Sequence, residues 1–204
     1  MPQTTKPRYH HGDLRNALIA AAVRILKDRG IAGLSLREVA AAAGVSHAAP
    51  YRHFPDKQAL LNAIAAQGHE RLRDGCRAAQ RDWPRDPKRQ WIEAGMHYLR
   101  FVLDNPEVAQ VMFGGAAPNA APDATLEQAI AEAVAALADI VDNGKSAGLY
   151  RGRNSRDIVL TSLSTVHGLS LLIGSGFAGR RLSHGRARAL AQRIAETLWR
   201  GLSD

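Results

Sequence analysis

The sequence predicts an all-α protein, and three observations indicate this class. Apolar residues recur every three or four positions along most of the 204-residue chain, which is the spacing of one face of an α-helix. Capping residues, glycines and prolines divide the chain into segments of helical length. The sequence shows neither the apolar–polar alternation of a β-strand nor an internal repeat. We therefore expect about nine helices.

Residues 35–44 are expected to form a short helix that ends in a tight turn. Ser35 and Glu38 have the spacing of a capping box, so the helix should begin at Leu36. Gly44 should end it, because glycine adopts the left-handed conformation without steric cost. The residues expected on its buried face are Leu36, Val39 and Ala40.

A second helix is expected directly after this turn, from His47 to about Phe54, with Ser46 as its N-cap. Pro50 falls in the first turn, where its missing amide costs little, so we expect it to stiffen the start of the helix. Two helices joined by a glycine turn form a helix-turn-helix, whose second helix enters the DNA major groove. The alternative is a surface helix whose polar groups are merely solvated. The groups suited to phosphates and base edges are His47, Tyr51, Arg52 and His53.

Basic residues are concentrated towards the N-terminus. Residues 1–57 contain nine Lys and Arg but four Asp and Glu, whereas the other 147 residues contain 18 and 15. Lys57 follows the expected cap Asp56 and lies in the first turn of a helix, where a cation opposes the helix dipole and suits an external anion. A basic module on a nearly balanced body fits a polyanion such as duplex DNA, although charge of this kind also serves solubility alone.

The remainder of the chain is predicted to be a helical bundle. A loop is expected from Gly114 to Asp123, and a break from Gly148 to Gly152. The expected helices are Lys57 to about Arg81, Pro87 to about Asp104, Pro106 to Phe113 (with Asn105 as N-cap), Thr125 to about Ala147, Ser155 to Gly174, and Ser183 to Leu202.

The segment from Tyr9 to about Ile64 resembles the DNA-binding domain of the TetR/AcrR family of bacterial repressors. The resemblance rests on Leu26–Gly30, Leu34–Ala40, Ala43–Ser46, Tyr51–Phe54 and Asp56–Lys57. It implies a homodimeric, all-helical repressor with a DNA-binding domain at residues 9–64 and an effector-binding and dimerisation domain at residues 65–204. It also implies phosphate contacts by Ser35, Arg37, Tyr51, His53 and Lys57.

Two further expectations concern the same domain and its subgroup. His47 and Ala48, at the start of the expected recognition helix, should approach base edges, with Ser46 as the cap. Val166-His167-Gly168 resembles a Trp-His-Gly signature of one subgroup of these regulators, with valine in place of tryptophan.

The last two expected helices suggest a dimer interface. Ser155–Gly174 is apolar on more than one face, and Ser164, Gly168 and Gly174 would allow close approach of another helix. Two such helices from each subunit would form a four-helix interface around a two-fold axis, whereas the alternative is a core helix in a monomer. The final helix carries an apolar stripe of Leu190, Ile194, Leu198 and Leu202.

The sequence contains none of the common enzymatic or metal-binding motifs. It has no phosphate loop, H-E-x-x-H, G-x-S-x-G or Cys/His cluster, so we expect no catalytic residue, metal or cofactor. Cys76 is expected to be an inert thiol. The polar N-terminus lacks the core of a signal peptide, and no apolar run is expected to span a bilayer, so a cytoplasmic protein is expected.

The middle helices suggest a pocket for a small, mostly apolar effector. His97 and His167 are the polar candidates, although a lone histidine on an apolar helix is more often a hydrogen-bonded core residue. The candidate walls are Trp91, Met96, Phe101, Met112 and Phe113.

Three functions compete at this point: an effector-responsive repressor on a palindromic operator, an architectural DNA binder without a ligand, and a small helical enzyme or carrier. Sequence-dependent, salt-sensitive DNA binding separates the first two from the third. Release from DNA by a ligand separates the first from the second.

Overall fold

A computed structural model describes residues 11–114, 123–150, 152–177 and 182–203, and this part of the chain is helical without a β-strand. The all-α prediction is therefore confirmed. The α-helices are α1 (His11–Arg29), α2 (Leu36–Ala42), α3 (Lys57–Asp82), α4 (Pro87–Asp104), α5 (Pro106–Phe113), α6 (Ala124–Ser146), α7 (Ser155–Gly174) and α8 (His184–Ser203). The expected helix from His47 to Phe54 is instead a turn followed by a short 3₁₀ helix, Pro50–Arg52, so the described part has eight α-helices and not nine.

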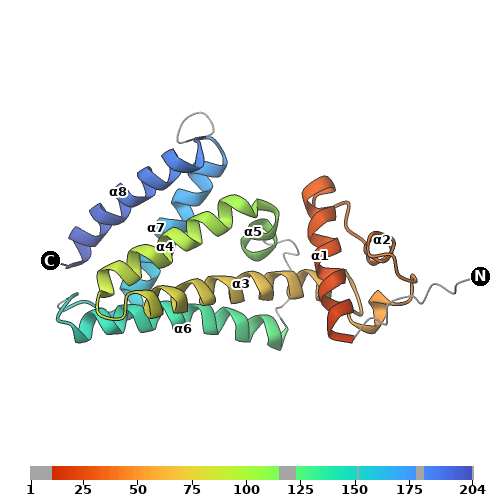
Figure 1. Cartoon of the computed structure of the whole chain (residues 1–204), viewed down its shortest axis with the longest axis horizontal. Coiled ribbons are helices and arrows are strands. Elements are labelled where there is room, and N and C mark those ends of the chain that lie inside the picture. The colour runs from red at the N-terminus through yellow and green to blue at the C-terminus, as the bar shows by residue number, and fades with distance from the viewer. Residues whose placement is uncertain (1–10, 115–122, 151, 178–181, 204) are drawn as a thin grey trace, which may run out of the picture.

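The long helix α3 connects the two ends of the molecule (Figure 1). α1, α2 and the 3₁₀ helix form a small unit at one end, where α3 begins. α3 then runs through the body of the protein beside α6 and α4, and α7 and α8 pack on α4. α3 therefore belongs to both parts of the molecule.

Side-chain caps set most of the helix boundaries that the sequence predicts. The carboxylates of Asp56, Asp86 and Asp123 accept backbone N–H bonds of 2.8–2.9 Å in the first turns of α3, α4 and α6. Asn105 differs from the expectation, because its side chain donates to the Phe101 carbonyl (2.9 Å) at the end of α4 and does not cap α5. Residues 115–122 of the expected loop lie outside the described part of the chain.

The N-terminal unit and the body share one hydrophobic core. Residues of α1 and α2 pack with the start of α3 and with Val108, Ala109 and Val111 of α5. Two further clusters fill the body, one around the packed rings of Trp91, Tyr150 and Trp199, and the other between α4, α7 and α8. α5 is therefore a second contact between the body and the N-terminal unit.

Tyr150 anchors the break between α6 and α7. It has a positive φ of 57°, which is rare for a bulky residue, and its side chain is 1% exposed. Its ring lies against Gly144 of α6 and 5.4 Å from the ring of Trp199, measured between centroids. The absence of a side chain at Gly144 makes room for the ring.

We expect Gly144→Ala to lower the free energy of unfolding by about 1–3 kcal/mol, because the new Cβ would lie 2.6 Å from Cε2 of the immobile Tyr150 ring. Gly95→Ala is the matched control, since it also lies within a helix but its new Cβ would meet no atom within 4 Å. That change should be neutral or stabilising by up to about 1 kcal/mol. Urea unfolding of both variants measures the difference, and equal effects would contradict this packing.

Candidate DNA-binding surface and ligand cavity

The turn after α2 has the hydrogen bonds of a Schellman motif. Gly44 has φ of +68°, its N–H donates to the Ala41 carbonyl (3.1 Å), and the N–H of Val45 donates to the Ala40 carbonyl (3.0 Å). Glycine adopts this φ without the clash that a Cβ would cause. The predicted glycine stop is therefore confirmed, and it turns the chain sharply towards the recognition segment, residues 46–54.

The predicted capping box at the start of α2 is present in a modified form, in which the Glu38 carboxylate pairs with the hydroxyl of Ser35. The Ser35 hydroxyl accepts from the Glu38 N–H (3.2 Å) and donates to the Glu38 carboxylate (2.9 Å). Glu38 also binds Arg29 at the end of α1, with 3.1 Å between charged atoms. Since both charged side chains are largely exposed, the ion pair orients α2 on α1 more than it stabilises the fold.

The recognition segment does not form the α-helix expected from His47. An α-helix starting at His47 needs an N–H at position 50 to bond the Ser46 carbonyl, and Pro50 lacks one. That carbonyl instead accepts from the Ala49 N–H at 3.0 Å, and a 3₁₀ helix follows. The N-cap position of this 3₁₀ helix is Ala49, so Ser46 does not have the capping position expected for it.

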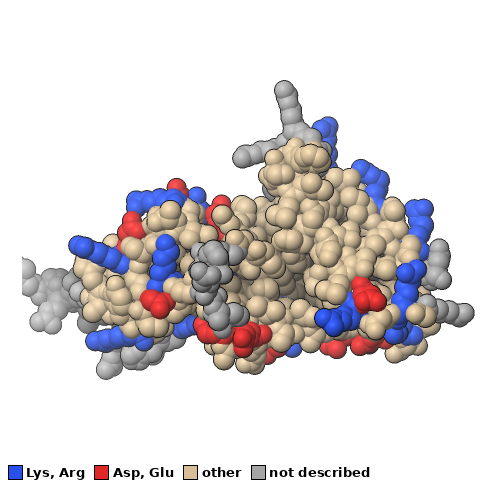
Figure 2. Space-filling model, turned by 180° about the vertical axis from the view of Figure 1, so that it is seen from behind, with Lys and Arg blue, Asp and Glu red and all other residues tan. Residues whose placement is uncertain are grey.

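Most of the expected DNA-contact residues lie on the outside of the N-terminal unit. Arg37, Ser46, His47 and Ala48 are exposed, as is 57% of Tyr51. His53 is half-buried beside the Phe54 anchor, which is 1% exposed. Ser35 is half-buried, and its hydroxyl is occupied within the capping box. Seen from behind, this end of the molecule carries several Lys and Arg side chains (Figure 2).

Lys57 has a structural contact that the sequence did not indicate. Its Nζ donates to the Ile31 carbonyl at 2.6 Å, which ties the first turn of α3 to the loop between α1 and α2. A lysine ammonium has three donor hydrogens, so this bond leaves two for an external anion.

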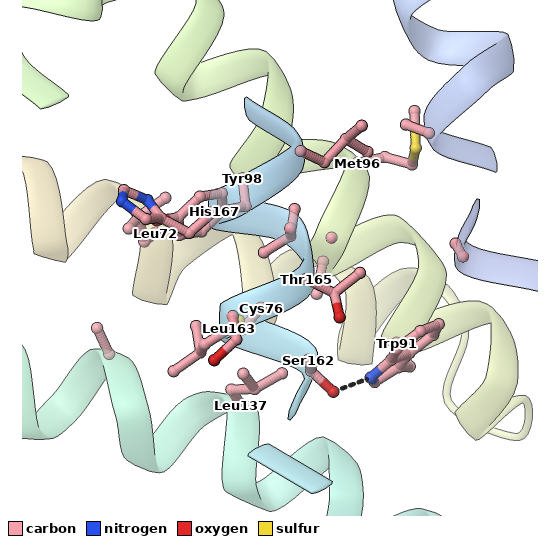
Figure 3. A pocket seen from close by; sticks show the side chains of 18 of the residues that line it. Leu72, Cys76, Trp91, Met96, Tyr98, Leu137, Ser162, Leu163, Thr165 and His167 are labelled. Atoms are coloured by element: carbon pink, nitrogen blue, oxygen red, sulfur yellow. Dashed lines mark hydrogen bonds between the residues drawn. The ribbon is translucent and has the colours of Figure 1, made fainter. Parts of the chain in front are cut away.

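The body contains a mostly apolar cavity of about 400 Å³ between α3, α4, α6, α7 and α8. Figure 3 shows Trp91 and Ser162 in one part of it and His167, Tyr98 and Leu72 in another. The Trp91 indole donates to the Ser162 hydroxyl at 2.9 Å, and that hydroxyl donates to the Ile158 carbonyl at 2.7 Å. This size is within the range of about 300–1,000 Å³ typical of small-molecule sites.

An aromatic cluster, consisting of His69, Tyr98, Phe113 and His167, lines the cavity away from Trp91. The ring of Phe113 lies 4.7 Å from that of His167 and 5.7 Å from that of His69, between centroids. The Tyr98 hydroxyl and Nδ1 of His167 share a 2.8 Å hydrogen bond. Burial lowers the pKa of His69 and raises that of Tyr98, which favours the neutral form of both side chains.

Two protein-family models match this chain. The model of bacterial regulatory proteins of the tetR family matches residues 18–64, and the model of the tetracyclin repressor-like C-terminal domain matches residues 91–198. The second match alone covers more than half of the sequence. The chain belongs to the TetR family. It is therefore a transcriptional regulator of that family.

Similar proteins match this chain over different lengths. A protein of unknown function from Rhodococcus sp. RHA1 is 32% identical, with a TM-score of 0.83 over 98% of this chain and 100% of that chain. The TetR-family regulator PfmR of Thermus thermophilus is 22% identical, with a TM-score of 0.69 over 92% and 99% of the two chains. The regulator CymR of Pseudomonas putida is 39% identical over 66 residues, so this chain spans about a third (32%) of that curated relative's length.

The cavity of this TetR-family protein contains some of the residues expected for the pocket. Trp91, Met96, Phe113 and His167 line it. His97 lies outside and bonds the Arg71 carbonyl at 3.1 Å, against Gly75 of α3. Phe101 belongs to the core shared with the N-terminal unit, and Met112 packs against Gly68.

α3 also contributes to the cavity, although none of the residues expected for the pocket lies on this helix. His69, Leu72 and Cys76 line it and share one face of that helix, with the three- and four-residue spacing that could have revealed them. Burial raises the pKa of the Cys76 thiol to about 11, so the thiol is protonated near neutral pH. The described residues contain no group of three or more His, Cys, Asp or Glu that could hold a metal ion.

The apolar residues of both α7 and α8 were expected at a dimer interface, but in the subunit the two helices differ. The stripe of α8 packs inside the subunit, where Leu190 and Ile194 contact one core cluster and Leu198 and Leu202 another. Leu169 of α7 is also buried. By contrast, α7 leaves an uncovered face with three exposed leucines: Leu160, Leu171 and Leu172.

The expectation that no apolar run is long enough to span a bilayer does not hold for α7. Ser155–Gly174 is long and apolar enough to cross a membrane by length and composition, and a third (33%) of its most apolar window is buried in the fold. It packs against α4, α6 and α8. One such helix is weak evidence for a membrane span.

Proposed function

We propose that this TetR-family protein is a cytoplasmic repressor that binds a palindromic operator as a homodimer and is released by a small, mostly apolar effector. The helix-turn-helix is the observation that carries the DNA-binding part of the proposal. Its capping box and Schellman turn hold a segment of exposed hydrogen-bonding side chains at an end of the molecule that carries several Lys and Arg side chains. Such groups suit phosphates and base edges.

We assign DNA binding to residues 9–64 and effector binding with dimerisation to residues 65–204. Within the first domain, His47 and Ala48 contact base edges, while Ser46 lies beside them on the same exposed segment. The phosphate contacts come from Ser35, Arg37, Tyr51, His53 and Lys57.

The dimer forms around the uncovered face of α7. Leu160 and Leu171 lie about three helical turns apart on one side of α7, with Ser164 and Gly168 between them. Small residues between large apolar ones allow a second helix to approach closely. A two-fold axis there sets the two recognition segments about 34–36 Å apart or somewhat more, which matches successive major grooves on one side of the duplex.

Effector release depends on the cavity and on its two connections to the DNA-binding domain. α3 contributes His69, Leu72 and Cys76 to the cavity. The first turns of the same helix pack in the hydrophobic core with α1 and α2. α5 contributes Phe113 to the cavity, while its other apolar residues pack on that same core. A ligand that prefers one arrangement of these helices shifts the spacing of the two DNA-binding domains by its difference in affinity.

The function is tested on DNA that flanks the gene. We expect the protein to bind an imperfect palindrome there in a sequence-dependent and strongly salt-sensitive manner, and an apolar compound to release it. Gel shift and fluorescence anisotropy at several salt concentrations measure both steps. Sequence-independent binding with no release by any compound favours an architectural role, and absence of DNA binding overturns the proposal.

A further inference from the structure

His69 is a mostly buried side chain that lines the cavity, and its ring nitrogens have no hydrogen-bond partner among the described residues. It is 8% exposed, and its ring lines the cavity beside Phe113. In its neutral form an imidazole has one N–H donor and one acceptor nitrogen. The fully buried unpaired side-chain atoms of the described chain are Gln90 Oε1, Glu107 Oε2 and Tyr150 OH, so the nitrogens of His69 remain accessible from the cavity. The partner that fits this position is a group on a bound molecule.

The rest of the lining restricts the charge of that molecule. No Lys, Arg, Asp or Glu is among the residues that line the cavity within the described chain. The Cys76 thiol is protonated, and the Ser162 hydroxyl is occupied by Trp91 and the Ile158 carbonyl. Burying an ionised head there would leave its charge without a counter-ion, which is costly.

The aromatic cluster offers a small polar site at one side of an apolar space. His167 uses Nδ1 with Tyr98 and retains Nε2, while both nitrogens of His69 are unpaired within the described residues. The hydroxyls of Ser164 and Thr165 also line the cavity and are unpaired there, but Ser164 is exposed and Thr165 half-buried, whereas His69 is more deeply buried. The other side is lined by aliphatic residues of α6, α7 and α8: Leu137, Leu163, Ile194 and Leu198.

We propose that the effector is an uncharged molecule with an apolar body and one hydroxyl or carbonyl head, and that His69 binds this head. The assignment rests on the proposed effector role of the cavity. It excludes carboxylates and ammonium compounds with the same apolar chain.

The test uses three probes that differ in the head: decan-1-ol, decanoate and decylammonium, titrated calorimetrically into the full-length protein near neutral pH. We expect decan-1-ol to bind at least about tenfold more tightly than either ion, because an unpaired charge is costly to bury. His69→Phe should weaken decan-1-ol binding by about three- to tenfold, the effect of losing one hydrogen bond. His69→Gln, which can donate and accept, should restore most of the affinity.

His97→Gln is the matched control, because His97 lies on α4 and bonds the Arg71 carbonyl outside the cavity. It should bind decan-1-ol as the unaltered protein does, and circular dichroism establishes that each variant is folded. Equal or tighter binding of decanoate or decylammonium overturns the proposal. So does binding of none of the three probes, unchanged affinity in folded His69→Phe, or loss of head preference in Thr165→Val instead.

Operator binding measured on the same samples reports on the proposed function separately. A protein that prefers decan-1-ol but binds no operator supports the ligand assignment and contradicts the repressor function. A protein that binds operator but shows no head preference supports the DNA-binding function and contradicts the ligand assignment.

Discussion

Leu171→Asp should convert the proposed dimer into monomers and reduce operator affinity by about a hundredfold or more. Leu171 is 57% exposed in the subunit, on the uncovered face of α7 that also carries Leu160 at 52%. In a two-fold interface the substitution occurs twice, and each buried carboxylate replaces apolar contacts worth about 2 kcal/mol or more. A monomer then loses the second half-site of a palindrome. Sedimentation velocity measures the assembly, and fluorescence anisotropy measures the affinity.

Ala131→Asp is the control for added charge, because Ala131 is exposed on α6 and the substitution changes the net charge equally. It should leave both measurements nearly unchanged. Leu169 and Leu198 are unsuitable sites for this test, since both line the cavity and a charge there would disrupt the subunit itself. A folded Leu171→Asp protein that sediments as a dimer would place the interface elsewhere.

His47→Ala should cost about 1–3 kcal/mol on the operator and relax the preference at one base pair in each half-site. His47 is exposed in the recognition segment, just after the Schellman turn, and our proposal assigns its ring a hydrogen bond to a base edge. Competition binding against operators substituted one base pair at a time gives the preference at each position. Retained preference at every position would mean that the recognition segment docks differently.

Lys57→Ala is the comparison for a phosphate contact. It should weaken binding to all sequences similarly and reduce the salt-dependence slope by about one unit. Because Nζ also bonds the Ile31 carbonyl, thermal unfolding must be measured alongside, so that a loosened loop between α1 and α2 is distinguished from a lost phosphate contact. Altered base preference in this variant, with no change in slope, would contradict the assigned role.

The sequence alone determined the helical class, most helix boundaries and the helix-turn-helix. The interactions that set these features join residues close together in the sequence, so the sequence alone predicts them. Examples are Ser35 with Glu38, Asp56 with the Ala59 amide, and Gly44 in its left-handed turn. The expected α-helix from His47 to Phe54 does not form, and the reason is local. Pro50 removes the N–H that a helix starting at His47 requires, so a 3₁₀ helix forms instead.

Tertiary structure decided which apolar faces are covered. The stripes of α7 and α8 look equally suitable for an interface, yet Leu198 and Leu202 pack into the subunit while Leu160 and Leu171 remain exposed. Likewise, His97 and His167 have similar sequence surroundings, but one bonds a carbonyl of α3 and the other faces the cavity. Periodicity shows that a helix has an apolar face. The partner of that face depends on contacts between residues far apart in the chain, which a local pattern does not record.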